Sequence, residues 1–184
     1  RAGIAGKAFP GIKNYFAKCK NSALSKGYIE LNPVSKRKSF IDFYETYKEY
    51  DKQTKEPAFW EDYRTHKAED SSMFNSHYKP LIREYFKYKG MIERKSLNYP
   101  IQGSSAEITK FAALKFFDTL IEMDLLNVVK ICNIVHDEIV IECPEKWAPE
   151  MAQILQSCME EAGKPFCKIV PLKAEPCITS FWNH

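Results

Sequence analysis

The amino-acid sequence predicts an α+β fold in which helices pack against an antiparallel sheet. Three observations support this fold class. Apolar residues recur at helical spacing after Gly103, two β-branched runs at residues 128–135 and 139–142 flank a short polar turn, and a second amphipathic pattern begins at Met151. Residues 167–175 predict one further strand. A long helix, a hairpin, a helix and a strand in this order indicate an antiparallel sheet with helices on one face.

The first 41 residues predict a helix and a short strand. Apolar side chains recur at helical spacing across residues 11–26, and Gly27 follows the expected helix end. Residues 28–31 then predict a strand, and the turn Ser-Lys-Arg-Lys at residues 35–38 is strongly basic. A basic turn is usually solvated, although it can also contact a phosphate group.

Residues 42–92 combine dense charge with many aromatic side chains. This composition is too aromatic for a disordered linker, so we expect two or three short helices, broken near Pro57 and Pro80. Tyr and Phe beside Lys could stack on unpaired bases. A separate hydrophobic cluster is the interpretation that we favour.

Helical spacing resumes over residues 82–97, and Asn98 with Pro100 is expected to end this helix, because proline disfavours helical geometry in the residue before it. The next helix is expected to begin at Ser104, since Ser104 and Glu107 fit the capping-box pattern. Its apolar stripe should pack one face against a core.

The net charge of +3 divides unevenly along the chain. Residues 1–103 hold 20 Lys and Arg against 12 Asp and Glu, a net charge of +8, whereas residues 104–184 hold 7 against 12, a net charge of −5. The first part therefore suits a polyanion, and the second offers acidic groups that could hold cations. A mixed charged surface is the simpler explanation for each part on charge alone.

Neither the N-terminus nor the cysteines indicate secretion or membrane insertion. The sequence starts with Arg1, without an apolar signal segment, and has no run near the roughly 18 apolar residues that a membrane span needs. Its six cysteines form no Cys-x-x-Cys pair, so free buried thiols in a reducing compartment are expected. We expect a cytoplasmic protein without a membrane partner, or a piece of a longer one.

The segment Ile131–Pro144, with the sequence ICNIVHDEIVIECP, places three titratable residues between two apolar runs. A carboxylate at a hairpin tip is held rigidly and still reaches solvent, which suits Mg²⁺ because this ion prefers oxygen ligands. Neighbouring strand residues point to opposite faces, so we favour Asp137 as the direct ligand and Glu138 as the secondary one. Because Asp in a turn is also common for backbone reasons, the pattern alone leaves a purely structural role open.

Two motifs in the same order resemble family A DNA polymerases, the group that includes bacterial DNA polymerase I. They are ERKSLNYPIQGSSAEITK at residues 93–110 and VHDEIVIE at residues 135–142. PGIKNYF followed by GYIE, and PLKAEPCITSFW near the C-terminus, extend the resemblance to both ends of the chain. The resemblance implies a palm-type antiparallel sheet that contains a catalytic hairpin. A mostly helical segment derived from the fingers subdomain is implied to precede it.

The resemblance also implies roles for the hairpin residues. Asp137 corresponds to one of two aspartates that bind the catalytic metal ions, and Glu138 to a supporting carboxylate near them. His136 corresponds to a residue that lies against the primer terminus. The implied reaction is two-metal nucleotidyl transfer from a dNTP to the primer 3′-hydroxyl, with two Mg²⁺ ions as cofactors.

Three further residues are implied to contact DNA. Arg94, Asn98 and Gln102 correspond to residues that face the primer-template duplex near the primer end, in its minor groove. Minor-groove edges offer hydrogen-bond acceptors on every base pair, so donors there can test pair geometry without reading the sequence.

Two motifs of the family are absent from the sequence: the "DYS"-like motif with the second aspartate, and the nucleotide-binding helix with its "K..NFG..YG" pattern. We therefore expect a polymerase segment in cis or in trans to supply them, and no activity from this piece alone. On the same resemblance, residues 1–41 end the fingers, residues 42–92 form a charged and aromatic insertion, and residues 93–184 form the palm.

The length of the insertion and the wording RKSLNYPIQGSSAEITK are most similar to phage-type members, which would place the protein in the host cytoplasm. Two alternatives remain open. One is the palm of a single-subunit RNA polymerase, against which Glu138 and the NYPIQG segment argue. The other is a non-catalytic DNA-binding or replisome module that retains the palm fold.

Overall fold

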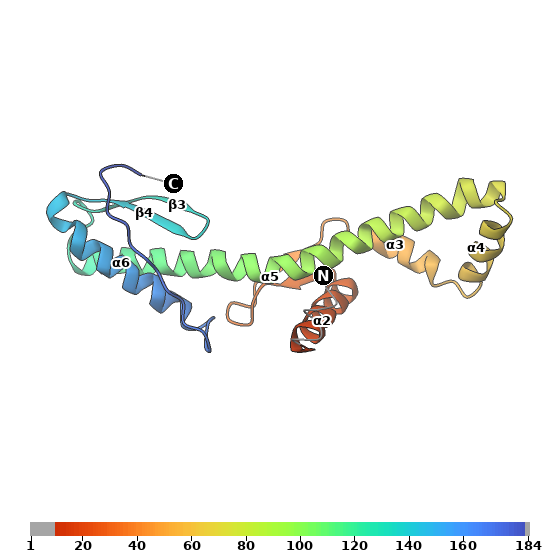
Figure 1. Cartoon of the computed structure of the whole chain (residues 1–184), viewed down its shortest axis with the longest axis horizontal. Helices are drawn as coiled ribbons and strands as arrows, with labels where there is room; N and C mark the ends of the chain where they lie inside the picture. The colour runs from red at the N-terminus through yellow and green to blue at the C-terminus, as the bar shows by residue number, and fades with distance from the viewer. Residues whose placement is uncertain (1–9, 183–184) are drawn as a thin grey trace. The chain divides into compact units, whose positions relative to one another are not determined.

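A computed structural model of the chain describes residues 10–182 (Figure 1). The elements are, in order, α2 (Pro10–Lys26), β1 (Tyr28–Glu30), β2 (Lys38–Phe40), α3 (Tyr44–Thr54), α4 (Phe59–Ala68), the π-helix η1 (Phe74–Tyr78), α5 (Lys79–Glu122), β3 (Lys130–Val135), β4 (Glu138–Glu142), the 3₁₀ helix η2 (Glu145–Trp147) and α6 (Ala148–Gly163). Helices together with two small antiparallel sheets, β1–β2 and β3–β4, confirm a mixed fold.

The described chain divides into two compact units. The first contains residues 10–31 and 36–100, and the second contains residues 32–35 and 101–182. Helix α5 contributes residues to both.

The start of the first unit follows the sequence closely. Helix α2 ends at Lys26, and Gly27 adopts a φ of 75°, a left-handed conformation that glycine takes without steric cost. A Cβ at this position would also overlap the ring of Tyr44. The predicted helix over residues 11–26 and the strand that begins at Tyr28 are confirmed. The partner strand β2, which pairs Tyr28 with Phe40, was not predicted.

Aromatic side chains form the core of the first unit between α3 and the start of α5. The rings of Tyr47 and Tyr85 stack with centroids 6.1 Å apart, and those of Tyr50 and Tyr88 stack at 5.9 Å. These four residues are called the tyrosine cluster below. Because the rings stack on one another, the structure favours the predicted hydrophobic cluster over exposed base-stacking platforms.

The helix boundaries in residues 42–92 match the prediction at one proline and differ at the other. The chain breaks between α3 and α4 around Pro57, as predicted. The expected break at Pro80 is wrong, because this residue lies at the second position of α5, directly after η1. Helical structure begins already at Ser72, so Pro80 lies inside a continuous helical run, and the irregular π-helical turn η1 directly precedes it, where the regular hydrogen-bond pattern that proline interrupts is already altered. The break falls instead near Asp70, where φ is 45°.

Helix α5 overturns two further boundary predictions. It continues through Asn98 and Pro100, so the helix does not end there. The bias that proline imposes on the preceding residue is a preference that the surrounding fold can override. The capping box at Ser104 and Glu107 is also wrong, because both residues lie inside the helix. The Glu107 carboxylate accepts a hydrogen bond from the side chain of Asn32 instead.

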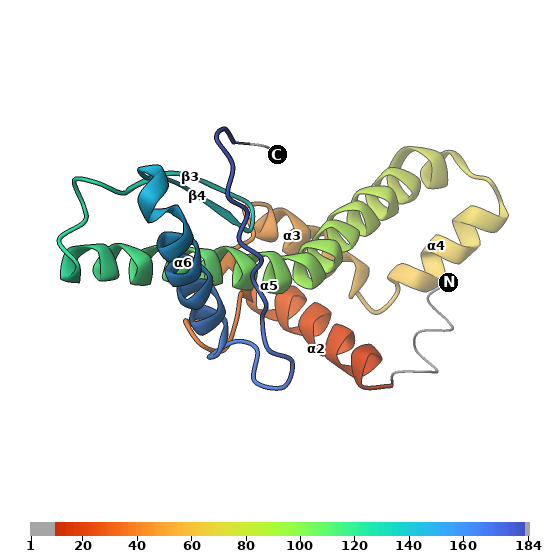
Figure 2. The same cartoon turned by 60° about the vertical axis from the view of Figure 1, so that its left-hand side comes forward.

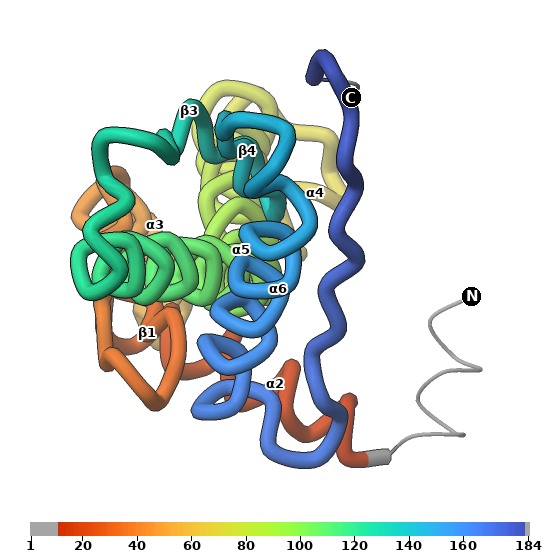
Figure 3. The backbone as a smooth tube through the Cα atoms, turned by 90° about the vertical axis from the view of Figure 1, so that its left-hand side faces the viewer, coloured from red at the N-terminus to blue at the C-terminus, as the bar shows by residue number. Residues whose placement is uncertain are grey.

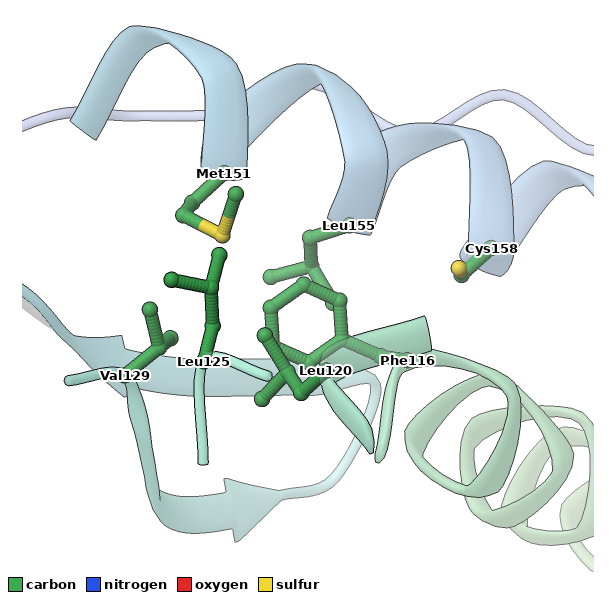
Figure 4. Packing of buried hydrophobic residues seen from close by; sticks show 7 residues of the cluster. All are labelled: Phe116, Leu120, Leu125, Val129, Met151, Leu155 and Cys158. Carbon is green, nitrogen blue, oxygen red and sulfur yellow. The ribbon is translucent and has the colours of Figure 1, made fainter. Parts of the chain in front are cut away.

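The core of the second unit lies between α5, α6 and the β3–β4 hairpin. Phe116 and Leu120 of α5 meet a row of α6 side chains, as Figure 4 shows. The complete cluster contains Phe116, Leu120, Leu125, Val129, Met151, Leu155 and Cys158. Phe116 and Met151 are fully buried. The amphipathic helix expected from Met151 is therefore confirmed, with its apolar face on this core. Figure 3 shows the backbone of α6 beside that of α5.

The strand expected at residues 167–175 is wrong. No strand of the described chain pairs with this segment, and Ile169 is 95% exposed. β-branched residues favour an extended chain, but a strand also needs a neighbour to accept its hydrogen bonds. The segment instead turns back beside α6 (Figure 2), where the Gln156 amide donates to the carbonyl of Ala174 at 2.9 Å.

The state of the cysteines and the apolar character of the helices bear on two further expectations. All six cysteines are free, as expected, but only Cys158 is buried. Cys19, Cys143 and Cys167 are half-buried, and Cys132 and Cys177 are exposed. Among the described residues, no helix is both long enough and apolar enough to cross a membrane.

Candidate metal and nucleic-acid binding site

The candidate site is built on the β3–β4 hairpin of the second unit. The two strands pair antiparallel, with Ile134 opposite Ile139 and Val135 opposite Glu138. Pairing is irregular between Ile131 and Asn133, which leaves one extra residue in β3, as in a β-bulge. The predicted hairpin is confirmed, with a two-residue turn, His136–Asp137, and with Glu138 as the first residue of β4.

One face of this hairpin is fixed to the core. Ile131, Ile139 and Ile141 pack against the buried cluster of Phe116 and its neighbours. Because successive strand residues point to opposite faces, Glu138 lies on the face away from that core. The core therefore holds the strands while the acidic side chains stay in solvent.

The turn contains one strained backbone position. His136 has a φ of 52°, in the left-handed region that few residues other than glycine adopt. Such a conformation costs on the order of 1 kcal/mol and persists only where the neighbouring structure imposes it. Here the paired strands on both sides impose it, so the turn has a defined shape.

The two carboxylates at the turn are exposed. Asp137 and Glu138 both lie at the surface, and the Asp137 carboxylate makes no hydrogen bond or ion pair with any residue between 10 and 182. Adjacent exposed oxygens fit a hard cation such as Mg²⁺, which completes its coordination with water and substrate phosphate. They fit it only in part: within residues 10–182, no three His, Cys, Asp or Glu side chains gather closely enough to hold a metal ion.

The other predicted DNA contacts lie on α5. Arg94 and Asn98 belong to the first unit, and Gln102 belongs to the second. All three are exposed. Arg94 and Asn98 are four residues apart in one helix, which places them on the same helical face one turn apart.

One pair of polar residues was missed by the sequence reasoning. Asn32 and Glu107 are both buried and share a hydrogen bond of 2.5 Å, although 75 residues separate them. The only sequence signal was the spacing of Ser104 and Glu107, which indicated a helix cap. A contact over such a distance in sequence leaves no local pattern.

Comparison with known proteins identifies the class. The family model described as DNA polymerase family A matches residues 6–184. DNA polymerase I of Aquifex aeolicus is 41% identical over 88 residues, or 48% of this chain and 15% of that protein. DNA polymerase I of Streptococcus pneumoniae is 30% identical over 154 residues, or 84% of this chain and 13% of that protein.

A solved structure supports the fold. It is the POL domain of Pol1 from M. smegmatis in complex with DNA primer-template and dNTP, with a TM-score of 0.55 and 21% identity. The match covers 85% of this chain and 20% of the solved one.

The sequence comparisons place the chain among the relatives of DNA polymerases. More particularly, it belongs to DNA polymerase family A, because the family model covers nearly all of its residues. The chain spans only 13% to 20% of the relatives described above.

Proposed function

We propose that this chain is the C-terminal catalytic portion of a template-directed DNA polymerase, which transfers a nucleotide from a dNTP to the primer 3′-hydroxyl. The observation that carries this proposal is the exposed Asp137 carboxylate, presented at the tip of a hairpin whose other face is packed on a buried core. Membership of family A supports it.

In this proposal the hairpin residues hold the reacting groups. Asp137 is a direct ligand of the metal ions, Glu138 supports them, and His136 lies against the primer end. When bound, two Mg²⁺ ions lower the pKa of the primer hydroxyl and neutralise the phosphates. The paired strands keep the backbone at Asp137 in place, so little backbone freedom is lost when the site assembles.

Side chains of α5 are proposed to hold the duplex. Arg94, Asn98 and Gln102 would donate hydrogen bonds to minor-groove acceptors near the primer end. Because such acceptors occur on every base pair, these donors would test the shape of the pair rather than its identity.

A carboxylate beyond those of Asp137 and Glu138 is needed, because two divalent ions carry more charge than these two groups can balance. We propose that another polymerase segment, in cis or in trans, supplies it together with the nucleotide-binding helix. Residues 1–41 would then end the fingers, residues 42–92 form an insertion and residues 93–184 complete the palm. The proposed location is the cytoplasm, or the host cytoplasm for a phage-encoded enzyme.

The test is Asp137→Ala in the polymerase with its remaining segment present. Primer extension should be abolished while DNA affinity stays within roughly tenfold, because a metal ligand stabilises the transition state more than the bound duplex. Asp118→Ala, which removes an exposed aspartate from α5 in the same unit, is the matched control and should extend primers normally. Undiminished extension by Asp137→Ala would contradict the catalytic role and favour a non-catalytic DNA-binding module.

A further inference from the structure

A row of exposed cations follows one face of α5 within the first unit. Lys79, Arg83 and Lys87 are exposed and stand four residues apart, which places them on the same face of the helix. Gly90 takes the next position on this face, and the exposed Arg94 follows it one turn later. The four charged residues are called the cation row below, and all of them belong to the first unit. At about 1.5 Å of rise per residue, the row is about 22 Å long.

The carboxylates that border the cation row are paired. Lys87 donates to Glu84 at 2.7 Å, and Lys20 of α2 donates to Glu93 at 3.1 Å. The opposite side of this part of α5 packs on the core of the first unit, where Ile92 is fully buried. Glu84 offsets only one of the four charges, so the row keeps a positive net charge and faces solvent. Such a surface attracts a polyanion.

Gly90 leaves a gap in the cation row. Glycine inside a helix lowers the stability of the helix, because it loses more chain entropy on folding than other residues. A Cβ built at this position would lie 3.3 Å from Nη1 of Arg94 and would otherwise face open space. Within the described residues, no packed neighbour therefore requires a glycine here. The gap instead allows a ligand to approach the helix backbone beside the Arg94 guanidinium.

We propose that the cation row binds the phosphate backbone of duplex DNA, and that Gly90 leaves room for the duplex against α5. The inference rests on the proposed function, because its ligand is the primer-template duplex. It extends the DNA contact proposed for Arg94 and Asn98 to Lys79, Arg83 and Lys87, which lie in the insertion of residues 42–92.

The spacing and the composition of the row favour a duplex. Duplex DNA carries one negative charge per roughly 1.7 Å of its axis, so a straight row of about 22 Å meets several phosphates at once. Sites for single strands use a succession of aromatic rings on which bases stack. Along the cation row the exposed aromatic side chain is Phe86 alone, which is 53% exposed.

The experiment measures the dissociation constant of the 184-residue chain for a DNA duplex of about 20 base pairs as a function of salt concentration. Lys79→Ala combined with Arg83→Ala should lower the salt slope by up to about 0.9 for each lost phosphate contact. Between about 50 and 200 mM salt, the affinity of this row variant should therefore fall roughly tenfold less than that of the wild type.

The matched control removes the same charge from another helix of the first unit. Arg64→Ala combined with Lys67→Ala changes two exposed cations on α4 and should keep the wild-type salt slope. Equal slopes for the row variant and this control would overturn the inference. Absence of duplex binding by the wild-type chain would overturn it as well.

Two substitutions at Gly90 test the gap. Both Gly90→Ala and Gly90→Leu introduce a better helix former and should raise the midpoint of urea unfolding. Gly90→Ala displaces Arg94 only slightly and should bind the duplex like the wild type. Gly90→Leu should weaken binding about fivefold, because its side chain stands between the helix and the phosphates. Equal affinities of the two variants for the duplex would overturn the role of Gly90.

Two further measurements separate this inference from the proposed function. For a single strand of the same length, the row variant should show the wild-type salt slope, and an equally lowered slope would overturn the assignment to a duplex. Primer extension by Asp137→Ala tests the catalytic role independently. Undiminished extension by that variant, together with a lowered duplex slope in the row variant, would refute the catalytic proposal and support the cation row.

Discussion

The hairpin turn at His136–Asp137 and the tyrosine cluster of the first unit both collect side chains that could contact nucleic acid, and the structure uses them in opposite ways. In the tyrosine cluster the rings stack on one another, and the hydroxyl of Tyr47 donates to Asp51 at 3.2 Å. At the turn, the Asp137 carboxylate makes no polar contact with any other residue that the structure describes.

This contrast in internal contacts separates structural from functional polar groups in this chain. Burial is the largest cause that raises the pKa of Tyr47, so its hydroxyl stays neutral and serves as a fixed donor. The turn instead combines an exposed carboxylate with a strained backbone on a packed frame. Groups that are satisfied internally stabilise the fold, whereas groups left in solvent on a rigid support are available to a ligand.

The largest expected effect tests the hydrophobic core on which the β3–β4 hairpin packs. Phe116→Ala should destabilise the second unit by about 3 to 5 kcal/mol, because it opens a cavity in a fully buried position. Urea unfolding followed by the fluorescence of Trp147, which packs against this core, measures the loss. Leu114→Ala, on the exposed side of the same helix, should change stability by less than about 0.5 kcal/mol. Similar losses for the two variants would mean that this core does not support the hairpin.

A smaller effect tests the tyrosine cluster. Tyr47→Phe should cost about 1.5 kcal/mol, since it leaves the ring in place and removes the hydrogen bond to Asp51. DNA affinity should not change, because the buried hydroxyl is already used internally. Tyr63→Phe is the control, as its hydroxyl makes no hydrogen bond within residues 10–182. Weaker DNA binding by Tyr47→Phe at unchanged stability would reverse the assignment and make the cluster part of the binding surface.

A change in the strained turn should raise the stability of the chain, whereas the two variants above lower it. His136→Gly relieves a left-handed conformation worth about 1 to 2 kcal/mol and adds the chain entropy of glycine, which costs about 0.5 to 1 kcal/mol. The net result should be a chain more stable by about 0.5 kcal/mol, measured by thermal unfolding. In the assembled polymerase, the proposed function predicts that primer extension should fall, because it assigns the imidazole of His136 to the primer end. His136→Ala separates the two effects: it removes the imidazole and keeps the strain, so extension should fall without a gain in stability.

The comparison also explains how far the sequence could predict the molecule. Local signals predicted the elements that local forces determine: Gly27 after α2, the hairpin around Asp137 and the apolar face that begins at Met151. Predictions that depended on distant partners were wrong. Residues 167–175 carry strand-forming side chains but have no strand beside them in the described chain.

The site was predictable only in part for the same reason. Asp137 stands out because a charged residue interrupts an apolar pattern, and the motif around it adds a second signal. Glu107 matched the pattern of a helix cap, and only the folded chain brings Asn32 to it. The prediction at Pro100 was wrong for a different reason. The local preference of proline to end a helix was overridden, and α5 continues through this residue.

The smallest expected effect compares, by pH, the Glu160–Ala174 contact of the second unit with the Tyr47 hydroxyl of the tyrosine cluster. The carboxylate of Glu160, on α6, accepts a hydrogen bond from the backbone amide of Ala174 at 3.4 Å. This bond is the main cause that lowers the pKa of Glu160 below its ordinary value of 4.5. A carboxyl whose pKa is lowered by folding stabilises the folded chain above pH 4.5 and loses this contribution as the pH falls through the lowered pKa. The contact around Ala174 should therefore loosen in acid, and only slightly, because Glu160 lies at the surface, where solvent screens charge. The shift of the Ala174 amide resonance between pH 6 and about pH 2.5 measures the change.

Glu160→Gln should remove most of this titration, since the neutral amide still accepts the hydrogen bond. The Tyr47 hydroxyl of the tyrosine cluster should not titrate in this range, because its pKa is raised above the ordinary value of 10.0 and it ionises only in strong alkali. An Ala174 resonance that titrates equally in Glu160→Gln would show that another group, and not this contact, responds to acid.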